Sequence, residues 1–168
     1  ERNYGVSLLN DCKYGHDIKD NVLRLTLLKS ATHPDIEQDQ GEHEFTYALL
    51  PHTGDFVAGK TVQESWALNQ PLKAIAGMAK EKEVSFITID NEEVELDAVK
   101  WSEDGKYMVV RIHEYASSKQ AVKIKFAFPI KGWMESDLME RPQEALRNEQ
   151  EIEITLKPFE IKTFLLEV

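Results

Sequence analysis

The residues with the clearest chemical potential follow an apolar run near the start of the chain. The stretch LLNDCKYG at residues 8–15 places Asn, Asp, Cys, Lys and Tyr in a single polar turn. Cys12 is the chain's one thiol, and the neighbouring Asp11 and His16 are residue types that can activate a thiolate nucleophile. Both neighbours belong to the same loop, however, and nothing in the sequence orients the imidazole. The pattern therefore favours a structural or ligand-contacting turn over a catalytic cysteine.

Acidic residues and histidines are also concentrated between positions 33 and 52. The segment 33–44, HPDIEQDQGEHE, holds five carboxylates and no Lys or Arg, and no apolar surroundings would raise their pKa values. We interpret it as a solvated acidic loop. The histidines do not have the H-E-x-x-H spacing of a zinc site. His43 and His52 would stand at opposite ends of one strand, nearly 30 Å apart at roughly 3.3 Å per residue. No metal site is predicted.

Composition indicates a globular protein and argues against two classes of partner. The chain has 168 residues, of which 42% are apolar and 30% charged, with a net charge of -10. An acidic surface repels phosphate backbones, so nucleic-acid binding is not expected. No apolar run approaches the roughly 20 residues that span a bilayer, and no signal peptide is visible, so no membrane partner is expected. A lone cysteine fits a reducing, cytoplasmic compartment. The start, without Met, is typical of an excised fragment.

Strand patterns dominate the first half of the chain. Strands are expected at 4–9, 22–30 and 45–52, and the nearly continuous leucines of 22–30 predict a strand buried on both faces. The sequence from Thr61 to Glu64 has the form of a capping box and predicts a short helix that stops before Pro71.

The second half predicts a small antiparallel sandwich. Periodicity is lost over residues 74–83, and Ser102-Glu103-Asp104-Gly105 is a hairpin signal between two strands. The polar stretch 134–148 predicts a connection with one helical turn. Strand patterns recur at 84–89, 94–101, 106–115, 121–128, 151–156 and 159–168. The predicted fold class is mainly β, with one or two short helices.

Beyond these patterns, a long run of motifs resembles the C-terminal region of glycoside hydrolase family 38 α-mannosidases, especially the bacterial and cytosolic type. The pieces are LLNDCKYG at 8–15, the leucine-rich strand 22–30, the Pro-Asp acidic loop 33–40 and GEHEFTYALLPH at 41–52. The tail, from WMESDLMERP to LKPFEIKTFLLEV, is similar to that family's C-terminus. The resemblance covers essentially the whole chain.

The resemblance implies a fold and a parent activity. Residues 1–80 would end a large antiparallel β-sandwich, a galactose-mutarotase-like supersandwich, and residues 84–168 would form a small terminal sandwich. Family members hydrolyse terminal α-linked mannose with retention, with a zinc ion and a catalytic Asp in an N-terminal barrel. No position here matches those ligands or that nucleophile, so the chain is expected to be inactive alone, without a cofactor of its own.

The resemblance also implies a place for the opening turn. In the family a loop of the β region reaches the edge of the substrate pocket, and Asn10, Asp11, Lys13 and Tyr14 are the candidates for sugar contacts. Cys12 would then point inward. An equal alternative is that the turn only packs a domain interface. The expected partners are the catalytic and helical domains of the same protein and mannose-containing glycans, with dimerisation through an exposed apolar surface as a further expectation.

An independent carbohydrate-binding module is the alternative from another class. It would present aromatic side chains on an exposed face, and Trp101 and Trp133 are its candidates, although both are expected at strand ends. A scaffolding role remains compatible with the mannosidase interpretation.

Overall fold

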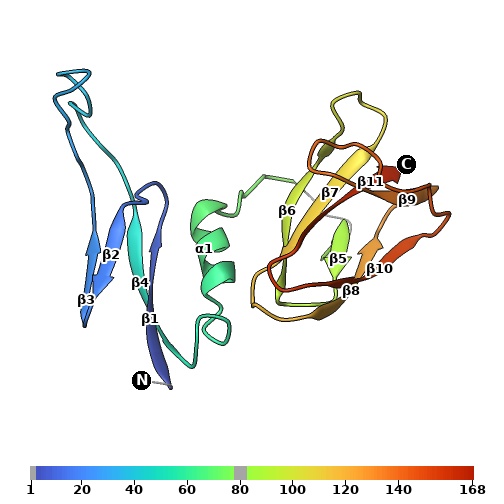
Figure 1. Cartoon of the computed structure of the whole chain (residues 1–168), viewed down its shortest axis with the longest axis horizontal. Coiled ribbons are helices and arrows are strands. Elements are labelled where there is room, and N and C mark those ends of the chain that lie inside the picture. Colours follow the sequence, from blue (N-terminus) through green and yellow to red (C-terminus); the bar gives the residue numbers. More distant parts are fainter. Residues whose placement is uncertain (1–2, 78–82) are drawn as a thin grey trace. The chain divides into compact units, whose positions relative to one another are not determined.

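The computed structural model describes residues 3–77 and 83–168, and the chain divides into two compact units, Glu1–Ala76 and Gly77–Val168. The expected boundary between residues 80 and 84 falls largely on residues 78–82, which lie outside the described residues. The described residues are mainly β, as predicted, and the strands and the helix are labelled in Figure 1. The helix in the described part of the chain is too short and too polar to cross a membrane.

The described residues of the N-terminal unit form two separate antiparallel strand pairs and one helix. Strand β1 (Tyr4–Asn10) pairs with β4 (Tyr47–Thr53), and β2 (His16–Lys19) forms a hairpin with β3 (Val22–Leu25). Helix α1 (Thr61–Asn69) follows β4 and contacts β1. The β3–β4 connection extends well away from the strands, as Figure 1 shows in blue and teal.

A close-packed junction joins β1, β4 and the start of α1. The Ser7 hydroxyl lies 3.1 Å from His52 Nε2 and 2.6 Å from Thr61 Oγ1, so one side chain links all three elements. The imidazole is wedged between two glycines. A Cβ at Gly59 would lie 2.3 Å from His52 Cγ, and one at Gly5 would lie 2.4 Å from His52 Cε1. Both positions therefore require glycine because the ring approaches the backbone so closely.

The C-terminal unit is a two-sheet sandwich with its own core. Its sheets have the orders β6-β7-β11-β9 and β10-β8-β5, and all the pairings within them are antiparallel. The strands are β5 (Ile87–Ile89), β6 (Val94–Trp101), β7 (Met108–Glu114), β8 (Gln120–Phe126), β9 (Gly132–Ser136), β10 (Glu151–Leu156) and β11 (Ile161–Glu167).

Side chains from both sheets interdigitate in this core, which explains the alternating sequence pattern. The alternation predicted for residues 121–128 is confirmed, because Val122 and Ile124 are buried. The rings of Trp133 and Phe164 meet edge to face, with centroids 5.6 Å apart, and the Trp133 indole N–H donates to the Glu151 carbonyl at 3.0 Å. The buried apolar members of the core are Val94, Val110, Ile112, Val122, Ile124, Ile130, Trp133, Ile152, Leu156, Phe164 and Leu166.

Two expectations for the N-terminal unit are wrong. The run 22–30 is not buried on both faces: β3 has four residues, its single partner is the unforeseen β2, and Val22 and Leu23 are exposed. Its leucines lack a covering sheet within the described part of this unit. Thr61 is not a capping residue either, because Lys60 takes the N-cap position with φ 53° and the Thr61 hydroxyl bonds Ser7 instead.

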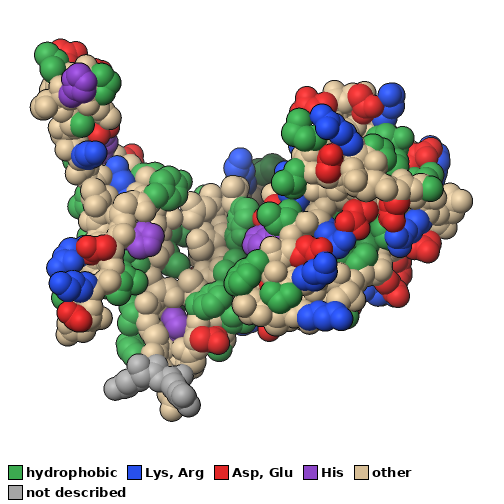
Figure 2. Space-filling model, viewed as in Figure 1, with side chains coloured by type: hydrophobic (Ala, Val, Ile, Leu, Met, Phe, Trp, Pro, Cys, Tyr) green, Lys and Arg blue, Asp and Glu red, His purple; other side chains and the backbone are tan. Residues whose placement is uncertain are grey.

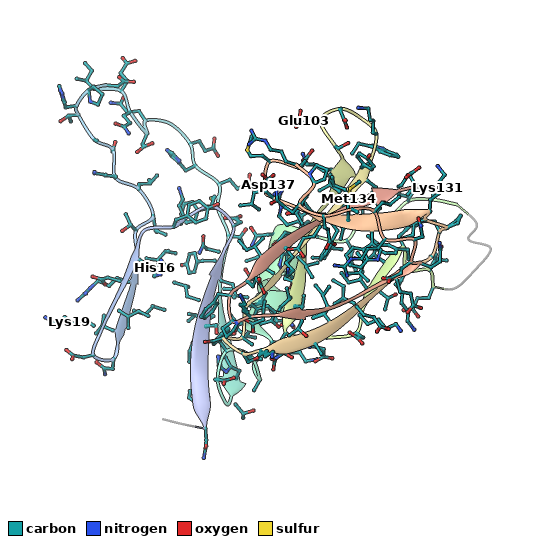
Figure 3. The ribbon with its side chains drawn as sticks, turned by 45° about the vertical axis from the view of Figure 1, so that its right-hand side comes forward. His16, Lys19, Glu103, Lys131, Met134 and Asp137 are labelled. Carbon is teal, nitrogen blue, oxygen red and sulfur yellow. The ribbon has the colours of Figure 1, made fainter. Side chains whose placement is uncertain are left out.

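The second expected helix is also absent from residues 134–148. Met134 and Ser136 belong to β9, which pairs with β11, and isolated bridges tie Arg147 to Trp133 and Pro142 to Ser136. The sequence did not indicate this strand, because polar residues within 134–148 are typical of a connection. The segment after β9 folds back along the sheet. Figure 3 labels Met134 on the strand and Asp137 just beyond its end.

Candidate functional site

The polar turn after β1 is held to the segment that leads into β4. The Asp11 amide donates to the Thr46 carbonyl at 3.2 Å, and the Thr46 amide donates to Asp11 Oδ2 at 2.9 Å. On the other side of the turn, Asn10 Oδ1 accepts from the Lys13 amide at 2.8 Å. The side chains of Asp11 and Asn10 therefore shape the backbone, as Asx side chains commonly do in turns.

Lys13, Phe45 and Tyr47 form a stack beside this turn. Lys13 Nζ lies 4.9 Å from the centre of the Phe45 ring, a cation–π distance. The Phe45 ring lies 6.5 Å from that of Tyr47 at an interplanar angle of 24°. Tyr47 is 56% exposed. It also borders an apolar groove with leucines of β1, of β4, and of β3 and the segment after it, lined by Leu8, Leu23, Leu25, Leu27, Tyr47 and Leu49.

The electrostatics of the turn argue against a cysteine nucleophile. The Thr46 amide, with the Cys12 thiol beside it, holds the pKa of Asp11 below its usual value. The Asp11 carboxylate in turn raises the pKa of Cys12, so less of the thiol is ionised, which is the opposite of what a nucleophile needs. Cys12 is exposed. The expectation that its side chain points inward is therefore wrong for this chain.

The predicted contact residues differ in their exposure and in the groups that their side chains contact. Tyr14 is 80% exposed, and its carbonyl lies 3.0 Å from His16 Nδ1. Lys13 presents its ammonium over Phe45, whereas the Asp11 carboxylate is engaged with Thr46. Figure 3 labels His16 where β2 begins and Lys19 toward the hairpin tip. The sugar contacts themselves remain a prediction.

The other sequence candidates do not assemble into a site. The acidic loop is exposed, and His43 Nε2 is 2.9 Å from the Asp39 carbonyl. In residues 3–77 and 83–168, no group of His, Cys, Asp and Glu has the arrangement to hold a metal ion. Trp133 is 1% exposed and belongs to the core, so it is not a sugar platform, whereas Trp101 is exposed.

Charges on the C-terminal unit are mixed in sign. Acidic and basic side chains intermingle on its visible face (Figure 2). Across the β8–β10 pair, Lys123 Nζ lies 2.5 Å from Glu151 Oε2 and 2.5 Å from Glu153 Oε1. Exposed pairs of this kind stabilise a fold by less than about 1 kcal/mol each. Lys123 and Glu153 also line a shallow surface pocket with Asp90.

The sequence reasoning missed two members of the turn's surroundings. Thr46 and Phe45 lie far along the chain from Asp11 and Lys13, and they meet them because β1 and β4 pair in register up to Asn10 and Tyr47. The only sequence signal for this contact was the position of both segments at neighbouring ends of two predicted strands.

These features define a class: a two-sheet β-sandwich unit preceded by a unit that consists, in its described residues, of two strand pairs and a helix. Comparison with known families gives two matches. Residues 93–164 match the glycosyl hydrolases family 38 C-terminal beta sandwich domain, and residues 1–37 match the glycosyl hydrolases family 38 C-terminal domain. The chain belongs to glycosyl hydrolase family 38, in its C-terminal β region.

Relatives extend this similarity over nearly all of the chain. Human alpha-mannosidase 2C1 is 34% identical across 99% of the chain, Dictyostelium discoideum alpha-mannosidase G is 31% identical across 98%, and the Saccharomyces cerevisiae alpha-mannosidase is 32% identical across 99%. The chain spans 17%, 16% and 18% of these relatives, respectively. A crystal structure of a family 38 protein from Enterococcus faecalis shares the fold, with a TM-score of 0.74, 21% identity, and coverage of 99% of this chain and 21% of that one.

Proposed function

We propose that this chain is the non-catalytic C-terminal β region of a retaining, zinc-dependent α-mannosidase. The observation that carries the proposal is the 34% identity to human alpha-mannosidase 2C1 over 99% of the chain. Catalysis would then belong to the other five sixths of such a protein. The described residues do not fit a zinc site, so no zinc ligand is assigned to them.

The role of the region in such an enzyme would be packing and pocket formation. Tyr4, Val6 and Leu49 share one face of the β1–β4 pair and are about half exposed, which supports packing of this face against the catalytic and helical domains. The turn with Asn10, Lys13 and Tyr14 would border the substrate pocket and contact a mannose-containing glycan. The exposed free thiol of Cys12 supports a reducing, cytoplasmic location.

The experiment is expression of the complete open reading frame that contains this chain. We expect hydrolysis of an aryl α-mannoside, loss of that activity on zinc chelation, and release of the α-anomer first when products are followed by NMR. The 168-residue chain alone is the matched control and should be inactive. A complete protein that leaves α-mannosides intact at all zinc concentrations would refute the proposal.

A further inference from the structure

Lys13 has an unusual setting for a cation on an acidic chain. Its ammonium lies over the Phe45 ring at 4.9 Å, and no ion pair to it is found among the residues described. An aromatic face attracts a cation without occupying its N–H donors as a carboxylate would. The ammonium is therefore held in place while its donors stay available to a ligand.

Phe45 is itself fixed from two sides. Its ring stacks on Tyr47, and its backbone neighbour Thr46 is clamped by two hydrogen bonds to Asp11. The pKa of Asp11 is lowered by the same Thr46 amide, so the carboxylate keeps its charge, and with it the clamp, well into the acidic range. Asp11 is thus connected to Lys13 by a series of contacts through Thr46 and Phe45.

We propose that Phe45 is a positioning residue that orients the Lys13 ammonium toward a hydroxyl of a bound mannose-containing glycan. Asp11 acts in the same way through Thr46 and does not touch the sugar. This inference rests on the proposed function, because it takes the glycan from it. The ammonium donates a hydrogen bond to the hydroxyl oxygen, and no covalent step is involved. Holding the long lysine side chain in place before binding lowers the entropy lost when the glycan docks.

The test is a double-mutant cycle in the complete protein, measured as kcat and KM for an α-mannoside. Lys13→Met removes the ammonium, Phe45→Leu removes the ring, and Phe45→Tyr keeps it. A surface cation–π contact of this kind corresponds to a change of about 2- to 5-fold. We expect Phe45→Leu to raise KM by about that factor with little change in kcat. Phe45→Tyr, which keeps an aromatic ring, should have the wild-type KM. Lys19→Met, on the hairpin tip, is the matched control and should leave KM unchanged.

The decisive comparison is between backgrounds. Once Lys13 is Met, Phe45→Leu and Asp11→Ala should have no further effect on KM, because each acts through the ammonium. If Asp11→Ala raises KM equally in both backgrounds, Asp11 contacts the glycan directly and its positioning role is overturned. If Phe45→Leu leaves KM unchanged, or lowers only the thermal midpoint, the positioning role of Phe45 is overturned.

The cycle also separates this inference from the proposed function. A wild-type protein that lacks α-mannosidase activity overturns both. An active wild-type enzyme in which Lys13→Met behaves like Lys19→Met preserves the proposed activity and overturns the inference alone.

Discussion

The buried carboxylate of Glu114 offers a sharp test of how the C-terminal sandwich is held together. Glu114 is fully buried at the end of β7, and its two oxygens accept three backbone hydrogen bonds. Oε1 accepts from Ala116 at 2.7 Å and from Ser118 at 3.1 Å, while Oε2 accepts from Phe159 at 2.7 Å. One side chain thus joins the β7–β8 turn to the β10–β11 turn. Each of these two turns connects a strand of one sheet to a strand of the other.

The substitution Glu114→Gln keeps the shape and removes one acceptor. The side-chain NH2 group then faces an amide N–H, so at least one charge-assisted hydrogen bond is lost, a contribution of about 1.5–3 kcal/mol. The amide left buried without a partner costs about 1–3 kcal/mol more. We expect the free energy of unfolding of the sandwich to fall by about 2.5–6 kcal/mol at neutral pH.

The pH dependence gives the effect a recognisable signature. Burial raises the pKa of Glu114, but the amide donors, led by that of Phe159, outweigh it and leave this pKa below its ordinary value. A carboxyl group with a lowered folded-state pKa stabilises the fold fully above its unfolded-state pKa, and that contribution is lost as pH falls through the folded-state pKa. The difference between wild type and Glu114→Gln should therefore be constant near neutrality and shrink in the acidic range below the ordinary glutamate pKa.

Guanidinium unfolding followed by fluorescence measures this difference. Replacing Trp66 and Trp101 by Phe in all variants leaves the buried Trp133 as the reporter of the sandwich. Glu153→Gln is the matched control, since that carboxylate is 69% exposed and pairs with Lys123 on the surface. A loss for Glu114→Gln no larger than the control's, or a difference that does not change with pH, would refute the reasoning.

Three further predictions concern the core, the glycine junction and the β6–β7 turn. Phe164→Ala should cost about 3–5 kcal/mol in denaturant unfolding, because the ring is fully buried, whereas Phe164→Leu should cost much less. Gly59→Ala should lower the thermal midpoint of the N-terminal unit, because the new methyl would overlap the His52 ring. The carboxyl group of Asp104 should titrate by NMR at about 2, because the Ser102 hydroxyl donates to it, and Ser102→Ala should raise that midpoint toward the ordinary value.

Sequence periodicity predicted the sandwich well because burial there follows local alternation. Residues 121–128 alternate in sequence and in burial, and Gly105 takes the positive φ of 69° that the predicted hairpin requires. The leucine run 22–30 shows the limit of the method. A dense apolar run predicts that a strand will be covered, but it carries no information about where the covering residues are in the sequence. The strand at 132–136 was not predicted for a related reason: its pairing with β11 is a long-range contact.

The candidate site was predictable in its residue types and not in its contacts. The turn after β1 was visible because polar residues interrupt an apolar strand, but the strand that follows it is the unforeseen β2 and not the predicted 22–30. The assignment of Asp11 as a sugar contact could not be weighed from sequence, since its engagement with Thr46 depends on the register of β1 and β4. The resemblance placed Cys12 inward, and in this chain its side chain is exposed instead.

The contrast between the two units carries the strongest physical argument for the proposed role. The C-terminal unit buries a continuous core, whereas Leu9 is the one buried apolar side chain among the described residues of the N-terminal unit. Ordering a residue costs roughly 1–2 kcal/mol of backbone entropy, which only burial of apolar surface on a comparable scale offsets. The leucines of β3 and the exposed face of β1–β4 are therefore surfaces that the fold needs covered. In the proposed mannosidase the remaining domains would cover these surfaces, and the turn with Lys13 would be fixed by the same contacts that complete the sheet.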